Sequence, residues 1–213
     1  MRDCLKSLAV LSCVALLPVA CKVVKTPDPE AASAVAQTDE ARMAVYAADI
    51  WDAKVLPMAK ESAVPLQELK AEIAANGLDA VGNAYGLRPE GEANPWNFVS
   101  SGEGVIIEAN TQSRAAKLAV DIDGNGAADL VVQLGPVVRG TALRDAMPFI
   151  IFSDFRDQIE FAKLARALND LASQSVTLPE GDLVGRRVEF EGVYTLRNAG
   201  DAIELVPTKL QVH

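Results

Sequence analysis

The chain has 213 residues, of which half are hydrophobic, and a formal net charge of −9. This length and composition suit one domain with a real core, or one domain plus an extension, and the acidic balance argues against a nucleic-acid partner, which would require a basic face. Three cysteines and one histidine exclude a Cys/His zinc cluster and a disulfide framework.

The N-terminus has the pattern of a secretory signal. Arg2 and Lys6 form a positive end, and the uncharged apolar run Leu8–Leu17 that follows is too short to span a bilayer. Small residues then precede Cys21, as in the lipobox of bacterial lipoproteins, which this segment resembles. In a lipobox the signal is cleaved before a cysteine whose thiol is acylated, with fatty acids such as palmitate. The segment departs from that pattern at Pro18, where the lipobox usually has leucine.

We therefore predict a signal peptide over residues 1–20, lipid attachment at Cys21 and a tether over residues 21–37. The alternative is ordinary secretion, with the thiol of Cys21 left free. Acylation would keep the mature chain on a membrane of the bacterial cell envelope, facing the periplasm. Because Lys22 rather than aspartate follows the cysteine, the lipoprotein resemblance implies sorting to the outer membrane in a Gram-negative cell.

Apolar residues recur at helical spacing over residues 38–95, which we predict as an N-terminal helical segment. The first helix should begin at an N-cap formed by Thr38 or Asp39, and Pro57 should kink or end it. The two shorter helices that follow are predicted over residues 65–76 and 78–84.

From residue 96 onward the apolar residues alternate with a period of two, which indicates strands. We predict one β-barrel domain over residues 96–213, with a bridging helix over about residues 153–175. That helix should be capped by Ser153 or Asp154. Its apolar stripe is expected at Ile159, Ala162, Leu168 and Leu171. The five strands are expected around residues 105–110, 117–120, 130–134, 187–195 and 202–212.

Three strands, a helix and two strands occur in the order of an OB-type barrel. The sequence therefore predicts an α+β protein, in which a small antiparallel OB-like β-barrel is preceded by the helical segment. The alternative is an open antiparallel sheet with helices on one face.

The sharpest local motif is the aspartate loop, residues 121–129, which reads Asp-Ile-Asp-Gly-Asn-Gly-Ala-Ala-Asp. Oxygen ligands at positions one, three, five and nine, with glycine at six, match the first part of a calcium loop, although Val132 stands where an EF-hand has glutamate. The motif resembles the calcium hairpins of integrin-type repeats. The alternative is a plain hairpin, because Asp, Asn and Gly favour turns. The candidate Ca²⁺ ligands are Asp121, Asp123, Asn125, the carbonyl of Ala127, and Asp129.

A second feature, residues 135–150, places charged side chains among apolar ones. The guanidinium groups of Arg139 and Arg144 can bind an anionic or polyhydroxyl ligand. Alternatively, Asp145 pairs with one arginine and fixes the turn before the long helix. Trp96 can either stack on a sugar ring or plug one end of the barrel. The candidate ligand or partner residues are Arg139, Thr141, Arg144, Asp145 and Trp96.

Taken in order, the motifs of this chain resemble a known family, the predicted periplasmic lipoproteins called domain of unknown function 2291. The resemblance rests on Cys21–Val24, Ile50–Pro57, Tyr85–Gly86, Pro95–Phe98, the aspartate loop, Gly135–Asp145 and Phe155–Glu160. The segment Gly135–Asp145 is the most specific of these. The resemblance implies an accessory of sugar ABC transporters. It implies no activity, so no residue inherits a catalytic role.

We therefore expect a lipid-anchored envelope accessory or binding module associated with a sugar ABC transporter. The alternative is a calcium-stabilised structural or adhesion module of the cell envelope. An enzyme is not expected, because the single histidine, His213, sits at the chain end, a poor place for a positioned base. The cysteines lie at positions 4, 13 and 21, so cleavage and acylation would leave no thiol nucleophile.

Overall fold

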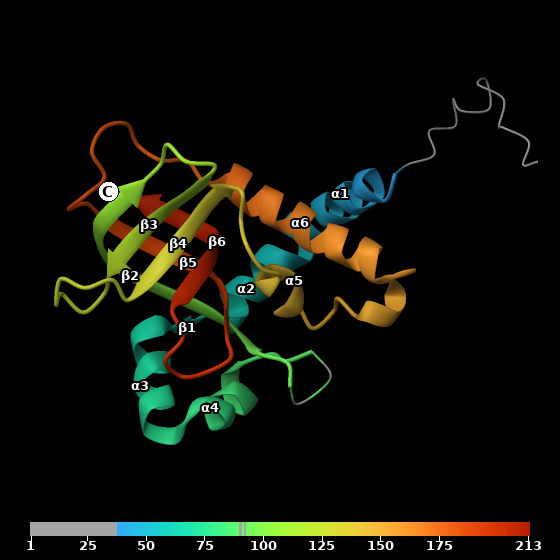
Figure 1. Ribbon diagram of the computed structural model, residues 1–213, viewed down its shortest axis with the longest axis horizontal. Coiled ribbons are helices and arrows are strands. Elements are labelled where there is room, and N and C mark those ends of the chain that lie inside the picture. The colour runs from blue at the N-terminus through green and yellow to red at the C-terminus, as the bar shows by residue number, and fades with distance from the viewer. Residues whose placement is uncertain (1–37, 90, 92) are drawn as a thin grey trace, which may run out of the picture. The chain divides into compact units, whose positions relative to one another are not determined.

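The computed structural model describes residues 38–89, 91 and 93–213 (Figure 1). The predicted signal peptide, lipid attachment at Cys21 and tether lie outside these residues. No helix in the described ranges combines the length and the apolar character needed to cross a membrane.

The first helix, α1, spans Asp39–Ile50, and the hydroxyl of Thr38 accepts a backbone N–H of its first turn (3.3 Å). This confirms Thr38 as the N-cap. The π-helical turn η2 (Trp51–Val55) follows, and then α2 (Leu56–Ser62). Pro57 thus lies in the first turn of α2, and the irregularity occurs just before it. Proline has no N–H to donate into the preceding turn, and a widened turn accommodates that loss.

The second and third predicted helices are α3 (Leu66–Asn76) and α4 (Leu78–Tyr85). Pro65 is the N-cap of α3 rather than its first helical residue, and it belongs to the two-residue strand β1 (Val64–Pro65). Gly77, with φ of +84°, ends α3 as predicted, because glycine adopts a positive φ without a steric penalty.

Five further strands form a closed barrel, which confirms the α+β class. The order of the strands in the sheet is β1-β2-β3-β4-β6-β5. The barrel is closed by an antiparallel pairing of β2 with β5, in which Trp96 pairs with Leu196 at one end and Val105 pairs with Arg187 at the other. That pairing excludes the open-sheet alternative. The pairs β2–β3, β3–β4 and β5–β6 are antiparallel, whereas β4–β6 is parallel. The strands are β2 (Trp96–Asn110), β3 (Ala115–Asp121), β4 (Leu130–Pro136), β5 (Arg187–Leu196) and β6 (Ile203–Val212).

Strand β2 is 15 residues long, whereas the sequence predicted only its last part, from residue 105. It pairs with β5 along residues 96–105 and with β3 along residues 105–110, and the short β1 pairs with residues 100 and 101. The small and polar residues 100–104 conceal it from a pattern search. A Cβ atom on Gly104 would overlap the carbonyl oxygen of Asp121 in β3, so the close approach of the two strands requires glycine there.

The bridging helix, α6, spans Gln158–Ser175, so the prediction that it starts near residue 153 was wrong. Its N-cap is Asp157, whose carboxylate accepts the backbone N–H of Glu160 (2.8 Å). Ser153 and Asp154 lie in a 3₁₀ turn, η3 (Phe152–Asp154).

The predicted apolar stripe of this helix is also wrong in part. Leu168 is buried and Leu171 half-buried, but Ile159 and Ala162 are exposed. The helix instead turns a face containing two polar residues inward, because Glu160 pairs with Arg42 of α1 (2.6 Å). The buried residues of α6 are Glu160, Leu164, Ala165, Leu168, Asn169 and Ala172.

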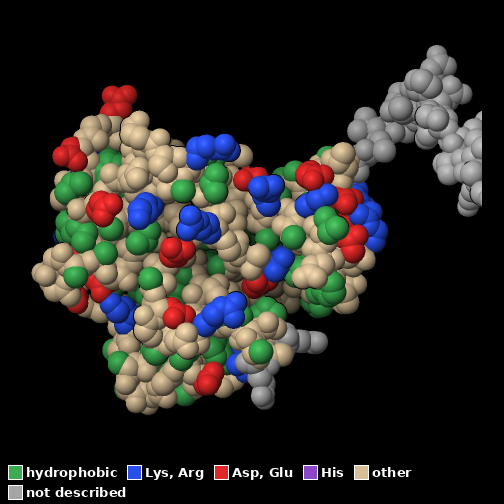
Figure 2. Space-filling view, viewed as in Figure 1, with side chains coloured by type: hydrophobic (Ala, Val, Ile, Leu, Met, Phe, Trp, Pro, Cys, Tyr) green, Lys and Arg blue, Asp and Glu red, His purple; other side chains and the backbone are tan. Residues whose placement is uncertain are grey.

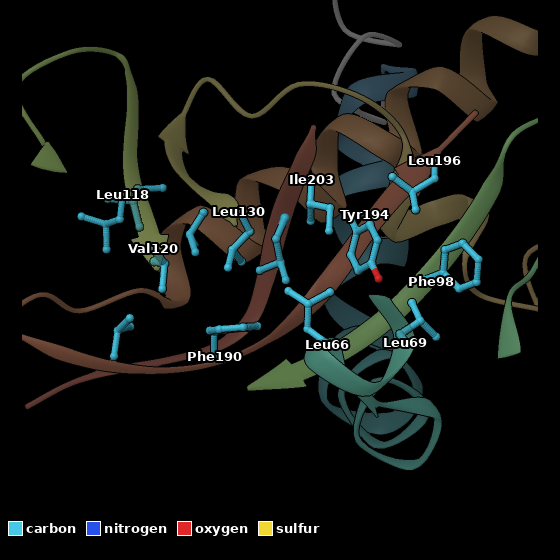
Figure 3. Packing of buried hydrophobic residues seen from close by; sticks show 14 of the residues in the cluster. Leu66, Leu69, Phe98, Leu118, Val120, Leu130, Phe190, Tyr194, Leu196 and Ile203 are labelled. Carbon is cyan, nitrogen blue, oxygen red and sulfur yellow. The ribbon is translucent and has the colours of Figure 1, made fainter. Parts of the chain in front are cut away.

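The described residues form two apolar cores. One fills the barrel, where side chains of β2 to β6 meet Leu66 and Leu69 of α3, which covers part of the interior (Figure 3). The other lies between the outer side of β5 and β6 and the helices α1, α6 and α5 (Ala142–Asp145). In this second core Leu143, Leu164 and Leu168 are fully buried.

Candidate functional site

The aspartate loop joins β3 to β4 and is held by its own backbone. The carboxylate of Asp121 accepts the N–H groups of Gly126 (2.7 Å), Gly124 (2.7 Å) and Asp123 (3.2 Å). These bonds, with that from Gly126 foremost, outweigh the effect of burial and lower the pKa of Asp121 below its ordinary value. Asp121 is therefore ionised at neutral pH.

Asp123 and Asn125 make similar local bonds further along the loop. Asp123 accepts the backbone N–H (3.0 Å) and the side-chain amide (2.9 Å) of Asn125. Asn125 in turn accepts the N–H of Ala127 (2.7 Å). These are the bonds that Asx turns make. The hairpin alternative therefore explains why the loop is rich in Asp, Asn and Gly.

Asp129 ties the loop to the helical segment. One of its oxygens accepts the N–H of Ile122 (2.8 Å), and the other pairs with the ammonium group of Lys70 on α3. Burial raises the pKa of Asp129, but the bonds from Lys70 and Ile122 outweigh it, so that the pKa lies below its ordinary value. The protein thus supplies one positive charge to the loop.

The same loop still has the geometry of a candidate metal centre. Carboxylate oxygens of Asp121, Asp123 and Asp129 lie within 4.8 Å of one another. Such a group of oxygens suits a hard cation such as Ca²⁺. Calcium binding by this loop stays a prediction, because the local hydrogen bonds and Lys70 satisfy the same carboxylates.

The calcium hypothesis predicts a specific thermal shift. Millimolar Ca²⁺ should raise the melting temperature of the wild-type chain, because a ligand that binds only the folded state stabilises it. Asp123→Ala should reduce the shift by removing one ligand. Differential scanning calorimetry with Mg²⁺ as the control ion would measure both. The absence of a shift at several millimolar Ca²⁺, or an equal shift in Asp123→Ala, would contradict the hypothesis.

Arg144 and Asp145 of the second sequence feature form an ion pair (2.7 Å). Asp145 also accepts the hydroxyl of Thr141 (2.5 Å), and Arg144 donates to the carbonyl of Phe161 in α6 (3.1 Å). The guanidinium carbon of Arg144 lies 3.7 Å from the centroid of the Phe161 ring. These contacts match the interpretation in which Asp145 pairs with an arginine and fixes the turn.

Arg139 is placed differently, with its side chain exposed. The buried amide of Gln133, on β4, accepts the backbone N–H of Arg139 (2.8 Å) and donates to its carbonyl (3.4 Å). This clamp fixes the turn, and the side chain of Arg139 borders a hollow of about 260 Å³ that Lys117 and Glu204 also line. Sequence reasoning singled out Arg139 but missed these partners, because they come from three different strands.

Trp96, at the start of β2, is surrounded by protein groups. Its side chain is 6 % exposed and its indole N–H donates to Asp79 of α4 (2.9 Å). Gly82 packs so closely against the indole that a Cβ atom would overlap it, and the guanidinium group of Arg88 lies 4.2 Å from the ring centroid. Protein groups therefore occupy the positions that a stacked sugar would need.

The described residues also form a larger hollow of about 690 Å³, between residues 87–89 and the segment 145–161. Its wall includes the exposed side chains of Ile151 and Phe152. The sequence did not predict this hollow, because its walls come from two segments that are distant in the chain.

Comparisons with known proteins agree with this architecture. A family model described as predicted periplasmic lipoprotein (DUF2291) matches residues 11–211. The crystal structure of an OB-fold protein from Thermotoga maritima is similar, with a TM-score of 0.64 and 21 % identity. That similarity covers 80 % of this chain and 98 % of the other, and at this identity it bears on the fold alone. No curated protein matches the chain.

Proposed function

We propose that this chain, which belongs to the DUF2291 family of predicted periplasmic lipoproteins, is a lipid-anchored accessory module that binds a component of a sugar ABC transporter. Family membership supports the periplasmic location and the membrane anchor. The transporter association is the finer step, and the hollow beside Arg139 is the observation that carries it.

The hollow occupies the surface that OB-type barrels use for ligands. In such barrels the face of the second and third strands, with the loop between the first and second, binds oligonucleotides and oligosaccharides. Here β3 and β4 are the second and third barrel strands, and Ser113 in the preceding loop also lines the hollow. The overall charge of −9 disfavours nucleic acid, which leaves polyhydroxyl or protein ligands.

The chemistry of the hollow suits a polar partner. Lys117 and Arg139 supply hydrogen-bond donors, and Glu204 supplies acceptors. At about 260 Å³ the hollow is shallow for a buried small molecule, and a polar surface of a partner protein would fit it better. We propose a soluble sugar-binding protein or a permease as that partner.

A binding role without catalysis accompanies this proposal. His213, the single histidine, is half-exposed at the chain end and lies 3.3 Å from Glu189. The residues lining the hollow include no histidine, cysteine or serine–histidine pair that would activate a nucleophile.

Site-specific photo-crosslinking in the native envelope tests the proposal. A photoreactive amino acid replaces Val137, which lines the hollow and is 44 % exposed, so that Arg139 is retained. We expect it to capture a sugar-binding protein or permease, identified by mass spectrometry. Arg139→Glu on the same background should reduce capture at least tenfold by reversing a contact charge.

The matched control is Arg166→Glu, which reverses an exposed arginine on α6, outside the hollow. Capture should be unchanged in this variant. Equal loss in both variants, or capture of no transporter component at Val137, would overturn the transporter proposal.

A further inference from the structure

Three large apolar side chains near the start of α6 are more than half exposed. Ile151 is 55 % exposed, Phe152 52 % and Ile159 64 %, and we call these three residues the apolar patch. Isolated exposed apolar side chains are normal, whereas neighbouring ones mark a contact surface. Ile151 and Phe152 are adjacent in the chain, and Ile159 follows in the first turn of α6. Nothing in the proposed binding role uses them.

The patch is built on a packed aromatic base. The ring of Phe152 meets that of Phe161 edge-on, with 5.2 Å between the ring centroids. The centroid of the Phe155 ring lies 5.1 Å from that of Phe161 and 6.0 Å from that of Tyr46 on α1. Backbone hydrogen bonds close the turn that carries Ile151 and Phe152 (3.1 Å each). The patch therefore presents its side chains from a fixed position.

The patch lies beside the residue at which the described fold begins. Arg156, between Phe152 and Ile159, pairs with Asp39 in the first turn of α1 (2.7 Å). Lys163 and Arg42 add further contacts between the starts of α1 and α6. In Figure 1 both helices begin at the same end of the molecule, and the C-terminus lies across the barrel.

We propose that the apolar patch docks onto the surface of the bilayer in which Cys21 is anchored. This inference rests on the lipid anchor of the proposed function. From Cys21 to Thr38 there are 38 − 21 = 17 residue steps, which span at most about 60 Å when fully extended. The start of α1, beside the patch, therefore lies no more than about 60 Å from the anchored residue. Tethering at this distance raises the effective concentration of lipid at the patch.

The charges around the patch favour zwitterionic over anionic lipid. Arg42, Arg156 and Lys163 are each paired with a carboxylate of Asp39, Glu40 or Glu160. Acidic and basic side chains are intermixed on the face shown in Figure 2. The polybasic surface that anionic lipid headgroups attract is therefore missing from this part of the described structure. Aromatic and branched apolar side chains insert at the headgroup boundary without such a surface.

Depth-dependent fluorescence quenching tests the docking. The full lipidated chain carrying Phe152→Trp is reconstituted into vesicles of phosphatidylethanolamine and phosphatidylcholine with brominated acyl chains. We expect the fluorescence that this substitution adds to the wild-type signal to be at least twofold weaker in brominated than in unbrominated vesicles. Trp51 and Trp96 are 7 % and 6 % exposed, so their contribution should stay constant. Ile159→Trp provides a second reporter should the change at residue 152 disturb the fold.

The matched control is Val184→Trp. Val184 is 50 % exposed and lies in the turn before β5, near the C-terminal end of the chain. It should show no quenching. Equal quenching at positions 152 and 184, or no quenching at 152 and 159, would overturn the docking. A blue shift at 152 only when envelope proteins are added would also overturn it in favour of a protein partner. Flotation separates the two proposals, because a wild-type chain that fails to float with vesicles lacks the anchor itself.

Discussion

Gly104→Ala is expected to lower the free energy of unfolding by about 3 kcal/mol, the upper part of the range for overpacked sites. The added Cβ would overlap the carbonyl oxygen of Asp121 and a methyl group of Val120. Backbone atoms yield less than side-chain ends, so β2 and β3 would have to move apart where β2 changes partner from β5 to β3. Urea denaturation followed by circular dichroism measures the change.

The control for this substitution is Gly200→Ala, in the β5–β6 turn. A Cβ atom there meets no atom within 4 Å, so the stability should change by less than about 0.5 kcal/mol. A Gly104→Ala chain as stable as the wild type would show that the barrel tolerates a wider separation of these strands.

Glu160→Leu is expected to have the second largest effect, about 2 kcal/mol. Glu160 is 5 % exposed, accepts a bond from Arg42 (2.6 Å) and accepts the N–H of Arg156 (2.8 Å). Leucine would leave both donors without this acceptor. The loss should stay below that of a fully buried pair, because the Arg42 side chain is 37 % exposed and regains water.

Glu160→Gln separates charge from shape in the same position. Its side-chain oxygen can still accept one of the two bonds, so we expect about half the loss of Glu160→Leu in thermal and urea unfolding. If glutamine and leucine destabilise the chain equally, the ionised carboxylate rather than the hydrogen-bond geometry holds α1 against α6.

Local signals predicted much of the fold. The Thr38 cap, the Gly77 stop and the alternation in β3 to β6 each depend on neighbouring residues, so the sequence alone indicates them. The start of α6 was also marked locally, since Asp157 and Glu160 have the spacing of a capping box. The apolar stripe was misplaced because Glu160 is buried by a partner on α1, which is 118 residues away.

The long-range contacts were beyond a pattern search. Residues 100–104 of β2 look like a loop because two glycines and two serines replace the apolar alternation. The pairing with β5, about 90 residues later, makes them a strand, and β1 pairs with residues 100 and 101. The hollow beside Arg139 also depends on long-range pairing. Lys117 of β3 and Glu204 of β6 line it because both strands lie next to β4 in the sheet. Trp96 likewise required its neighbours Gly82 and Arg88 to be placed before its role was visible.

The pairing of β2 with β5, which closes the barrel, joins distant parts of the chain. It joins Trp96 to Leu196, which are 196 − 96 = 100 residues apart, so the barrel cannot close before most of the chain is available. Contacts between such distant segments form slowly. The topology of the closed barrel therefore suits a protein that folds after it has reached the periplasm.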